Sequence, residues 1–263
     1  MKKILLFNVI AILSISGIFS QDFLPTPPAG FEWVLNEAIS DEFENQNTLD
    51  TEKWHPRLPF WRGRVPAEFL PENVFVGTVN DNGVDKGMMY IRNTVHPNPN
   101  DGYTIAGGGI ESRQTQKYGY FEARMKASDI RMGSAFWLNT NRNWDNPRVD
   151  SPNRGDGCFG YAAEIDIQEC LGGGNDFWAK RVHVNTHFKR KRFRDGTQNC
   201  YQEFLSEGDF SKVLPDNEKV SDDFHIYSAW WVDANTVRFY FDGELVKEIK
   251  RNDGPVKGDK EEA

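Results

Sequence analysis

Alternation of apolar and polar residues dominates the chain and predicts short β-strands. In residues 119–126, the apolar Phe121, Ala123 and Met125 alternate with mostly polar residues. Residues 182–188 alternate in the same way. Successive side chains of a strand point to opposite faces, so a period of two indicates strands. No helical period of useful length occurs.

Turn signals between these runs indicate how the strands are connected. Asp242-Gly243 separates two strand-like runs, residues 236–241 and 244–249. This dipeptide favours a primed two-residue turn, so the two runs are predicted to form a hairpin. From residue 73 onward, short runs recur with turn residues every ten or so positions. This spacing predicts an all-β fold in one domain, a sandwich or jelly roll.

Residues 162–170 are the run in which acids interrupt an apolar, β-branched strand. Regular alternation places Glu164 and Asp166 on one face and Glu169 on the other. A β-bulge around Ile167-Gln168 adds one residue and brings the three carboxylates to the same face. Two glutamates so placed suit a retaining glycosidase, in which one attacks the anomeric carbon and the other protonates the leaving oxygen. A calcium site or a solvated strand face remains an alternative for this spacing.

The N-terminus has the features of a secretory signal peptide. Lys2 and Lys3 precede a mostly apolar run, residues 4–13, that is too short to span a bilayer. We expect residues 1–20 to be removed and residues 21–263 to be secreted or periplasmic, with no membrane anchor. The chain has 31 basic and 39 acidic residues, a net charge of −8. This balance argues against a nucleic-acid partner.

Cysteine and histidine spacing gives no sign of a metal site. Cys158, Cys170 and Cys200 permit at most one internal disulfide and lack the paired spacing of zinc ligands. Cys170 is expected to be a buried core thiol. His183 and His187 would lie about 13 Å apart on a strand, too far for one ion. We therefore expect no metal ligands and no cofactor, with a structural calcium as the alternative.

Four segments of the chain together resemble glycoside hydrolase family 16, the β-jelly-roll endo-glycanases. They are residues 109–126, 135–138, 164–169 and 225–243. The resemblance implies a sandwich of two antiparallel sheets with a concave substrate cleft. It also implies that Glu164 is the nucleophile, Glu169 the general acid/base and Asp166 the residue that hydrogen-bonds the nucleophile.

The bulged ExDxxE spacing is that of laminarinases, agarases, porphyranases and carrageenases within this family. Residues 61–66 and 139–147 are similar to loops of marine β-galactan hydrolases. The family fold continues past the Asp242-Gly243 hairpin with at least one more strand. The catalytic domain, residues 21–263, is therefore expected to be truncated at its C-terminus.

Aromatic and basic residues supply the expected substrate contacts. An indole matches the apolar face of galactose, and a guanidinium binds a sulfate through two parallel hydrogen bonds. Polar residues beside the catalytic strand are expected to bind sugar hydroxyls. The expected substrate-binding residues are Trp61, Arg62, Arg64, Trp137, Trp144, His183, Asn185 and His187.

The sequence thus predicts a secreted, monomeric, retaining endo-hydrolase of a β-linked algal galactan, agarose or porphyran. Its partner would be the polysaccharide, which in porphyran is sulfated. The enzyme alternatives are a β-1,3-glucanase (laminarinase) and a κ-carrageenase. A carbohydrate-binding jelly roll without activity is an alternative of another class. The complete set of three carboxylates in phase argues against that last alternative.

Overall fold

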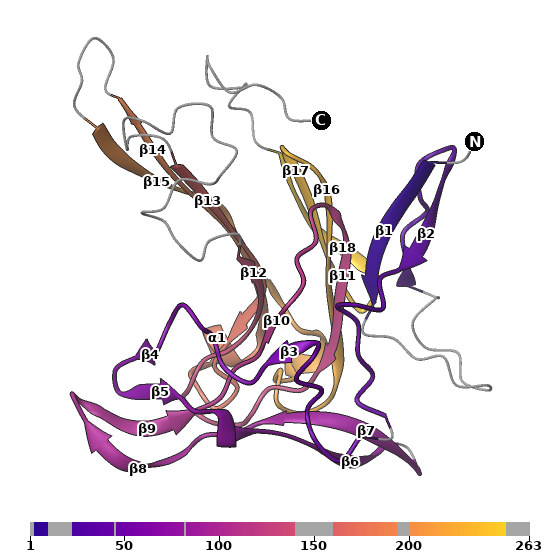
Figure 1. Ribbon diagram of the computed structural model, residues 1–263. Coiled ribbons are helices and arrows are strands. Elements are labelled where there is room, and N and C mark those ends of the chain that lie inside the picture. Colours follow the sequence, from indigo (N-terminus) through magenta and orange to yellow (C-terminus); the bar gives the residue numbers. More distant parts are fainter. Residues whose placement is uncertain are drawn as a thin grey trace. The chain divides into compact units, whose positions relative to one another are not determined.

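The computed structural model describes residues 3–9, 23–44, 46–81, 83–139, 160–193 and 200–250 (Figure 1). Strands dominate these residues, with one short helix, α1 (Asp176–Ala179), and two 3-10 turns, η2 (Pro71–Asn73) and η3 (Pro215–Asn217). The all-β prediction is therefore confirmed. No helix among the described residues is long and apolar enough to cross a membrane.

The chain divides into two compact units, and each is described by itself. The first holds residues 1–20 and 27–117, and the second holds residues 21–26 and 118–263. The first unit contains small sheets. They are the parallel pair β1 (Lys3–Val9) and β2 (Phe31–Leu35), the pair β3 (Trp54–His55) and β10 (Glu111–Ser112), the hairpin β6 (Val74–Asp81) and β7 (Val84–Ile91), and a four-stranded sheet of β4 (Gly63–Arg64), β5 (Ala67–Phe69), β9 (Tyr103–Gly107) and β8 (Thr94–Asn100).

The core of the first unit is organised around a buried carboxylate. Phe43, Leu49, Trp54, Val74 and Val76 form the hydrophobic cluster. The carboxylate of Asp41, which is 5% exposed, accepts hydrogen bonds from the Trp54 indole N–H at 3.0 Å and from the Phe43 backbone N–H at 2.8 Å. A buried polar group is tolerated where hydrogen bonds satisfy it, so these contacts fix the loop that precedes β3.

The second unit is a sandwich in which two sets of four antiparallel strands face each other. One sheet has the order β18 (Glu244–Lys250), β17 (Thr236–Phe241), β16 (His225–Asp233) and β11 (Gly119–Met125). The other has the order β12 (Ser134–Asn139), β13 (Gly160–Cys170), β14 (Arg181–Phe193) and β15 (Cys200–Val213). Strand β13 lies against β16 and β15 against β18, so the two sheets face each other across the core.

The predicted C-terminal hairpin is confirmed at β17 and β18. Asp242 and Gly243 have φ values of 46° and 81°, the left-handed values that a type I′ turn requires at both central positions. Asp242 also holds the end of β16, because its carboxylate accepts from the Ile226 N–H at 2.8 Å and contacts the His225 ring at 2.9 Å. The turn is therefore tied to its neighbouring strand as well as formed locally.

Strand β11 occurs where alternation predicts it, but both of its faces are packed. Glu122 is only 3% exposed, and its carboxylate accepts a hydrogen bond of 2.9 Å from the Tyr120 hydroxyl. That hydroxyl also lies 2.7 Å from Ser228 Oγ on β16. Burial raises the pKa of Glu122 to about 7, because the charged form loses its hydration. The polar face of this strand is thus a buried network.

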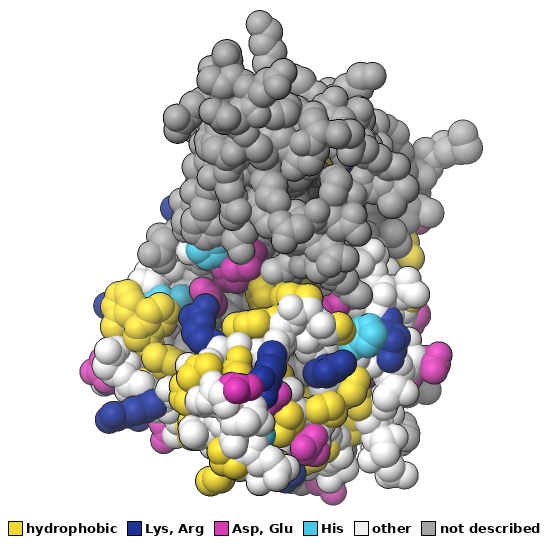
Figure 2. Space-filling model, turned by 60° about the vertical axis from the view of Figure 1, so that its left-hand side comes forward, with side chains coloured by type: hydrophobic (Ala, Val, Ile, Leu, Met, Phe, Trp, Pro, Cys, Tyr) yellow, Lys and Arg dark blue, Asp and Glu magenta, His cyan; other side chains and the backbone are white. Residues whose placement is uncertain are grey.

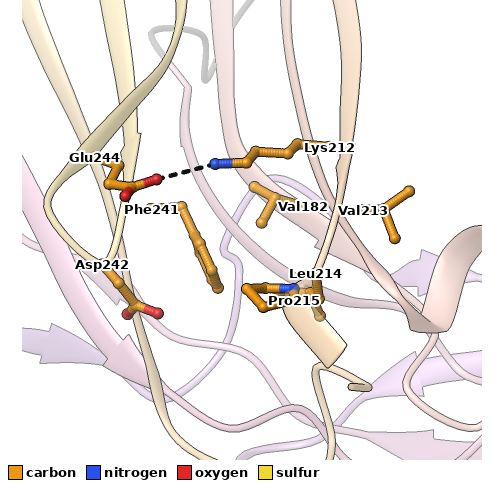
Figure 3. A pocket seen from close by; sticks show the side chains of 8 residues that line it. All are labelled: Val182, Lys212, Val213, Leu214, Pro215, Phe241, Asp242 and Glu244. Atoms are coloured by element: carbon orange, nitrogen blue, oxygen red, sulfur yellow. Dashed lines mark hydrogen bonds and ion pairs between the residues drawn. The ribbon is translucent and has the colours of Figure 1, made fainter. Parts of the chain in front are cut away.

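A cavity of about 170 Å³ lies between the end of β15 and the β17–β18 hairpin (Figure 3). Val182, Leu214 and Phe241 line its apolar side, and Lys212 pairs with Glu244 at 3.1 Å beside it. Val182 and His183 are neighbours on a strand and point to opposite faces. The cavity therefore opens on the face of the β12–β15 sheet opposite to the one that carries His183.

Candidate active site

The three acidic residues of β13 come together because the strand carries a bulge. In the β12–β13 ladder, Phe136 lies opposite Gln168 while Trp137 lies opposite Asp166, so Ile167 is the extra residue. Residues directly opposite in an antiparallel ladder share a face. Glu164, Asp166 and Glu169 lie opposite Asn139, Trp137 and Ala135. The bulge predicted around Ile167-Gln168 is confirmed, and it places the three carboxylates on one face.

The middle carboxylate is buried, whereas the outer two are accessible. Asp166 is 3% exposed, while the Glu164 side chain is 25% exposed and Glu169 is exposed. Burial, followed by the nearby charges of Glu169 and Glu164, raises the pKa of Asp166 to about 8. Asp166 is therefore mainly protonated at neutral pH. The position between the two glutamates is then occupied by a neutral carboxyl group instead of a third negative charge.

Strand β14 adds polar groups beside these acids. His187 lies opposite Glu164, and Asn185 lies opposite Asp166. The His187 Nε2 atom is 3.2 Å from Asp166 Oδ2 and 3.9 Å from Glu164 Oε1. The Asn185 Nδ2 atom lies 3.3 Å from the same His187 nitrogen. Histidine and carboxylate side chains also adjoin one another on the molecular face drawn in Figure 2.

From the sequence, His183 was expected to bind sugar hydroxyls together with Asn185 and His187, but its packing does not fit this expectation. His183 does share the face of Asn185 and His187, but it is only 5% exposed. The rings of Trp178 and Phe177 on α1 cover it, with centroids 4.4 Å and 5.0 Å away, and its Nε2 atom lies 2.8 Å from the Phe177 carbonyl oxygen. His183 is therefore a packed residue under α1 and offers little to a sugar.

Two residues near the acids were missed by the sequence reasoning. Asn139 ends β12 opposite Glu164, and its amide donates a hydrogen bond of 3.2 Å to Glu164 Oε2. Gln168, inside the bulge, is fully buried and contacts the backbone of β14. Only the strand register reveals either contact, so the linear sequence gave no signal for them. Trp137, which the sequence proposed for sugar stacking, is half-buried opposite Asp166.

The two arginines of the loop at residues 61–66, in the first unit, have different environments. Arg62 makes two hydrogen bonds to the Glu68 carboxylate, at 2.7 Å and 3.1 Å, and contacts Asp101 at 3.3 Å. Its donors are therefore committed within the protein, which weakens the expectation that it reads a sulfate. Arg64 is exposed, and its guanidinium carbon lies 5.9 Å from the centre of the Trp61 ring.

Trp61 itself packs edge-on against Phe69, with ring centroids 5.3 Å apart. Trp144, the other predicted stacking residue, lies outside the described residues, as does Cys158. Cys170 is a free thiol that is 3% exposed, as predicted for a core residue. Its Sγ atom lies 3.6 Å from the Ser134 carbonyl oxygen on β12.

Ligand atoms of Glu164, Asp166 and His187 lie within 4.8 Å of one another, so these groups could in principle hold a metal ion. The grouping differs from the His183–His187 pair considered from the sequence. It coincides with the carboxylates that suit a glycosidase, so acid–base chemistry and metal binding would compete for the same atoms. The prediction that no metal takes part stays a prediction.

Two accessible glutamates on one face, with a buried aspartate between them, are the kind of groups that a glycoside hydrolase uses for its chemistry. The family model described as the GH16 domain of beta-porphyranases A–D matches residues 33–260. The chain therefore belongs to glycoside hydrolase family 16, and within it to the group that this model describes. It is a glycosidase of jelly-roll fold, as the sequence predicted.

Several known proteins similar to this chain are named beta-porphyranases. Beta-porphyranase B of Phocaeicola plebeius is 37% identical over 86% of this chain and 71% of its own length. Beta-porphyranase E of Zobellia galactanivorans is also 37% identical, over 82% of this chain and 69% of its own. The crystal structure of the beta-porphyranase BpGH16B of Bacteroides plebeius has a TM-score of 0.65 and 34% identity, and covers 88% of this chain and 78% of that one.

Proposed function

We propose that the protein is a retaining endo-hydrolase that cleaves the β-linked galactan porphyran, with Glu164 as nucleophile and Glu169 as general acid/base. The observation that carries the proposal is the bulge at Ile167, which aligns both glutamates on one face. Membership of the family of porphyranase domains supports the substrate class. Agarose, whose backbone is related, is the second candidate substrate.

In the first half-reaction, Glu164 attacks the anomeric carbon while Glu169 gives its proton to the departing glycosidic oxygen. The C–O bond breaks, and a glycosyl ester of Glu164 forms. In the second half-reaction, Glu169 removes a proton from water, which attacks the same carbon and releases Glu164. Two inversions give net retention, and every proton lost by Glu169 in one step returns in the next.

The neighbours of Glu164 suit the role of a nucleophile. The Asn139 amide donates to Glu164 Oε2 at 3.2 Å, which orients this carboxylate. Asp166, with its pKa raised to about 8, adds no negative charge beside it at neutral pH. The repulsion that three ionised carboxylates would cause is therefore avoided.

The site of action follows from the chemistry of the substrate. A polysaccharide is too large to enter a cell intact, so its endo-hydrolase must reach it outside the cytoplasm. The charged and apolar pattern of residues 2–20 supports export through a cleavable signal peptide. We expect the exported protein to act as a monomer on the polysaccharide.

The decisive experiment is release of reducing ends from porphyran, agarose, κ-carrageenan and laminarin by the purified protein. We expect the highest kcat/KM on porphyran, and NMR of the first products should show the β anomer. The Glu164→Gln and Glu169→Gln variants should lose turnover, whereas Glu52→Gln, at an exposed acid of the first unit, should not. Highest activity on laminarin or κ-carrageenan, or an α anomer as first product, would refute the proposal.

A further inference from the structure

The two strands that carry the polar face stop pairing in the middle of the site. The β13–β14 ladder runs from Gly160 opposite Lys191 to Asp166 opposite Asn185 and ends there, within the described strands. Strand β13 continues past Asp166 for four residues: Ile167 is the extra residue of the bulge, and the next three pair with β12 alone. The backbone that holds Glu169 is therefore supported by a ladder on one side only.

The Gln168 side chain spans the resulting gap. Its Oε1 atom accepts a hydrogen bond of 2.9 Å from the His183 backbone N–H. Its Nε2 atom donates one of 3.4 Å to the Arg181 carbonyl oxygen. Both partners belong to β14, and Gln168 is 0% exposed. One side-chain amide therefore does between β13 and β14 what a backbone peptide group does in a regular ladder.

This bridge bears on which way Glu169 points. A shift of one residue in a strand turns each later side chain to the opposite face. If β13 paired with β14 without the bulge, Glu169 would point away from Glu164 and Asp166. With its amide occupied by the β14 backbone, Gln168 is held in the core layer, and the next residue, Glu169, is directed to the polar face.

We propose that Gln168 is a positioning residue for Glu169: its buried amide clamps the bulge to β14 and thereby keeps the acid/base in phase with Glu164. This proposal rests on the proposed function. The hydrogen-bond partners of the Gln168 amide are backbone groups of β14. The residue therefore acts by fixing the position of Glu169 and not by contact with the substrate. Glutamine fits the role because one end of its amide accepts and the other donates.

The test is Gln168→Met, which keeps the length and removes both hydrogen bonds. Turnover of porphyran needs a proton from Glu169, whereas the phenol burst from an oligosaccharide aryl glycoside with a good leaving group does not. We expect kcat on porphyran to fall about 10- to 100-fold, as for a catalytic group displaced by about 1 Å, with KM changed by less than about threefold. The burst rate on the aryl glycoside should stay near that of the wild type.

A matched control is Gln116→Met. Gln116 also bridges with its amide, accepting from Asn36 Nδ2 at 3.0 Å and donating to the Lys117 carbonyl at 3.0 Å, but it lies in the first unit. We expect its kcat on porphyran to be unchanged. Gln168→Glu, which keeps the acceptor for the His183 N–H, should restore part of the porphyran activity lost in Gln168→Met, most strongly at acidic pH where its carboxyl is neutral.

Equal losses on porphyran and the aryl glycoside would assign Gln168 a merely structural role and overturn the proposal, as would full porphyran activity in Gln168→Met. If that variant does not fold, judged by near-ultraviolet circular dichroism, the same comparison is made with Gln168→Glu at alkaline pH, where the introduced carboxyl is ionised and cannot donate. A loss selective for porphyran then supports the clamp, and a parallel loss or none overturns it. The proposed function fails separately, through an active Glu169→Gln variant.

Discussion

The buried carboxyl of Asp166 should make the folded protein less stable as the pH rises. Its pKa in the fold is about 8, raised from 3.8 mainly by burial. Between these values the native state holds a proton that the unfolded chain has released, so its stabilising effect is present below about pH 4 and is lost as the pH rises through 8. Three pH units, from 5 to 8, correspond to about 4 kcal/mol for this one group.

The perturbation that isolates this effect is Asp166→Asn, because the amide has the shape of the protonated acid and cannot ionise. We expect the free energy of unfolding of this variant, relative to the wild type, to rise by up to about 4 kcal/mol between pH 5 and pH 8. Urea denaturation followed by tryptophan fluorescence at both pH values measures it. Asp85→Asn, at an exposed acid of β7, is the control and should keep the wild-type pH dependence.

An unchanged pH dependence in Asp166→Asn would refute this reasoning, because it would mean that Asp166 ionises normally in the fold. The neighbouring His187 provides an internal check. Its Nε2 atom lies 3.2 Å from Asp166 Oδ2, so a hydrogen bond donated by this nitrogen would stabilise the Asp166 carboxylate and shrink the effect. Replacement of His187 by Gln should therefore leave the Asp166-linked loss of stability intact or enlarge it.

Three further predictions concern other described residues. Azide should restore turnover to Glu169→Ala on an activated aryl glycoside, with an azido sugar as product, because a small anion attacks the glycosyl ester without a general base; absence of that product would count against the acid/base role. Arg64→Ala should lower kcat/KM on porphyran about 10-fold or more relative to agarose, since a charge-assisted contact contributes roughly 1.5 to 3 kcal/mol. Arg62→Ala, which removes the partner of Glu68, should affect both polymers alike. Equal losses on the two polymers in the Arg64 variant would show that Arg64 does not recognise sulfate. Glu122→Gln should gain up to about 3 kcal/mol of stability over the wild type between pH 5 and pH 7, because burial raises the pKa of Glu122 to about 7; identical urea midpoints for the two proteins at pH 7 after matching at pH 5 would contradict this.

The buried polar groups explain why part of the site could not be foreseen. Period-two alternation describes which face a side chain is on, but not what covers that face. His183 and His187 share a face, yet α1 covers one and leaves the other beside the acids. Glu122 looks like a surface residue of β11 until β16 packs Ser228 against its Tyr120 partner. The segments that bury a strand face are distant from it in sequence, so no local pattern predicts which of its side chains become buried.

Local sequence determined the parts of this protein that depend on chain geometry alone. The Asp242-Gly243 turn follows from the left-handed φ that these residues tolerate, and the ExDxxE spacing requires a bulge if its acids are to meet. Tertiary structure decided the rest: which strand holds the Gln168 amide, which arginine of the 61–66 loop is paired with Glu68, and which carboxyl has a raised pKa. Those properties depend on burial and on partners from other strands, and a linear sequence specifies neither until the strands have paired.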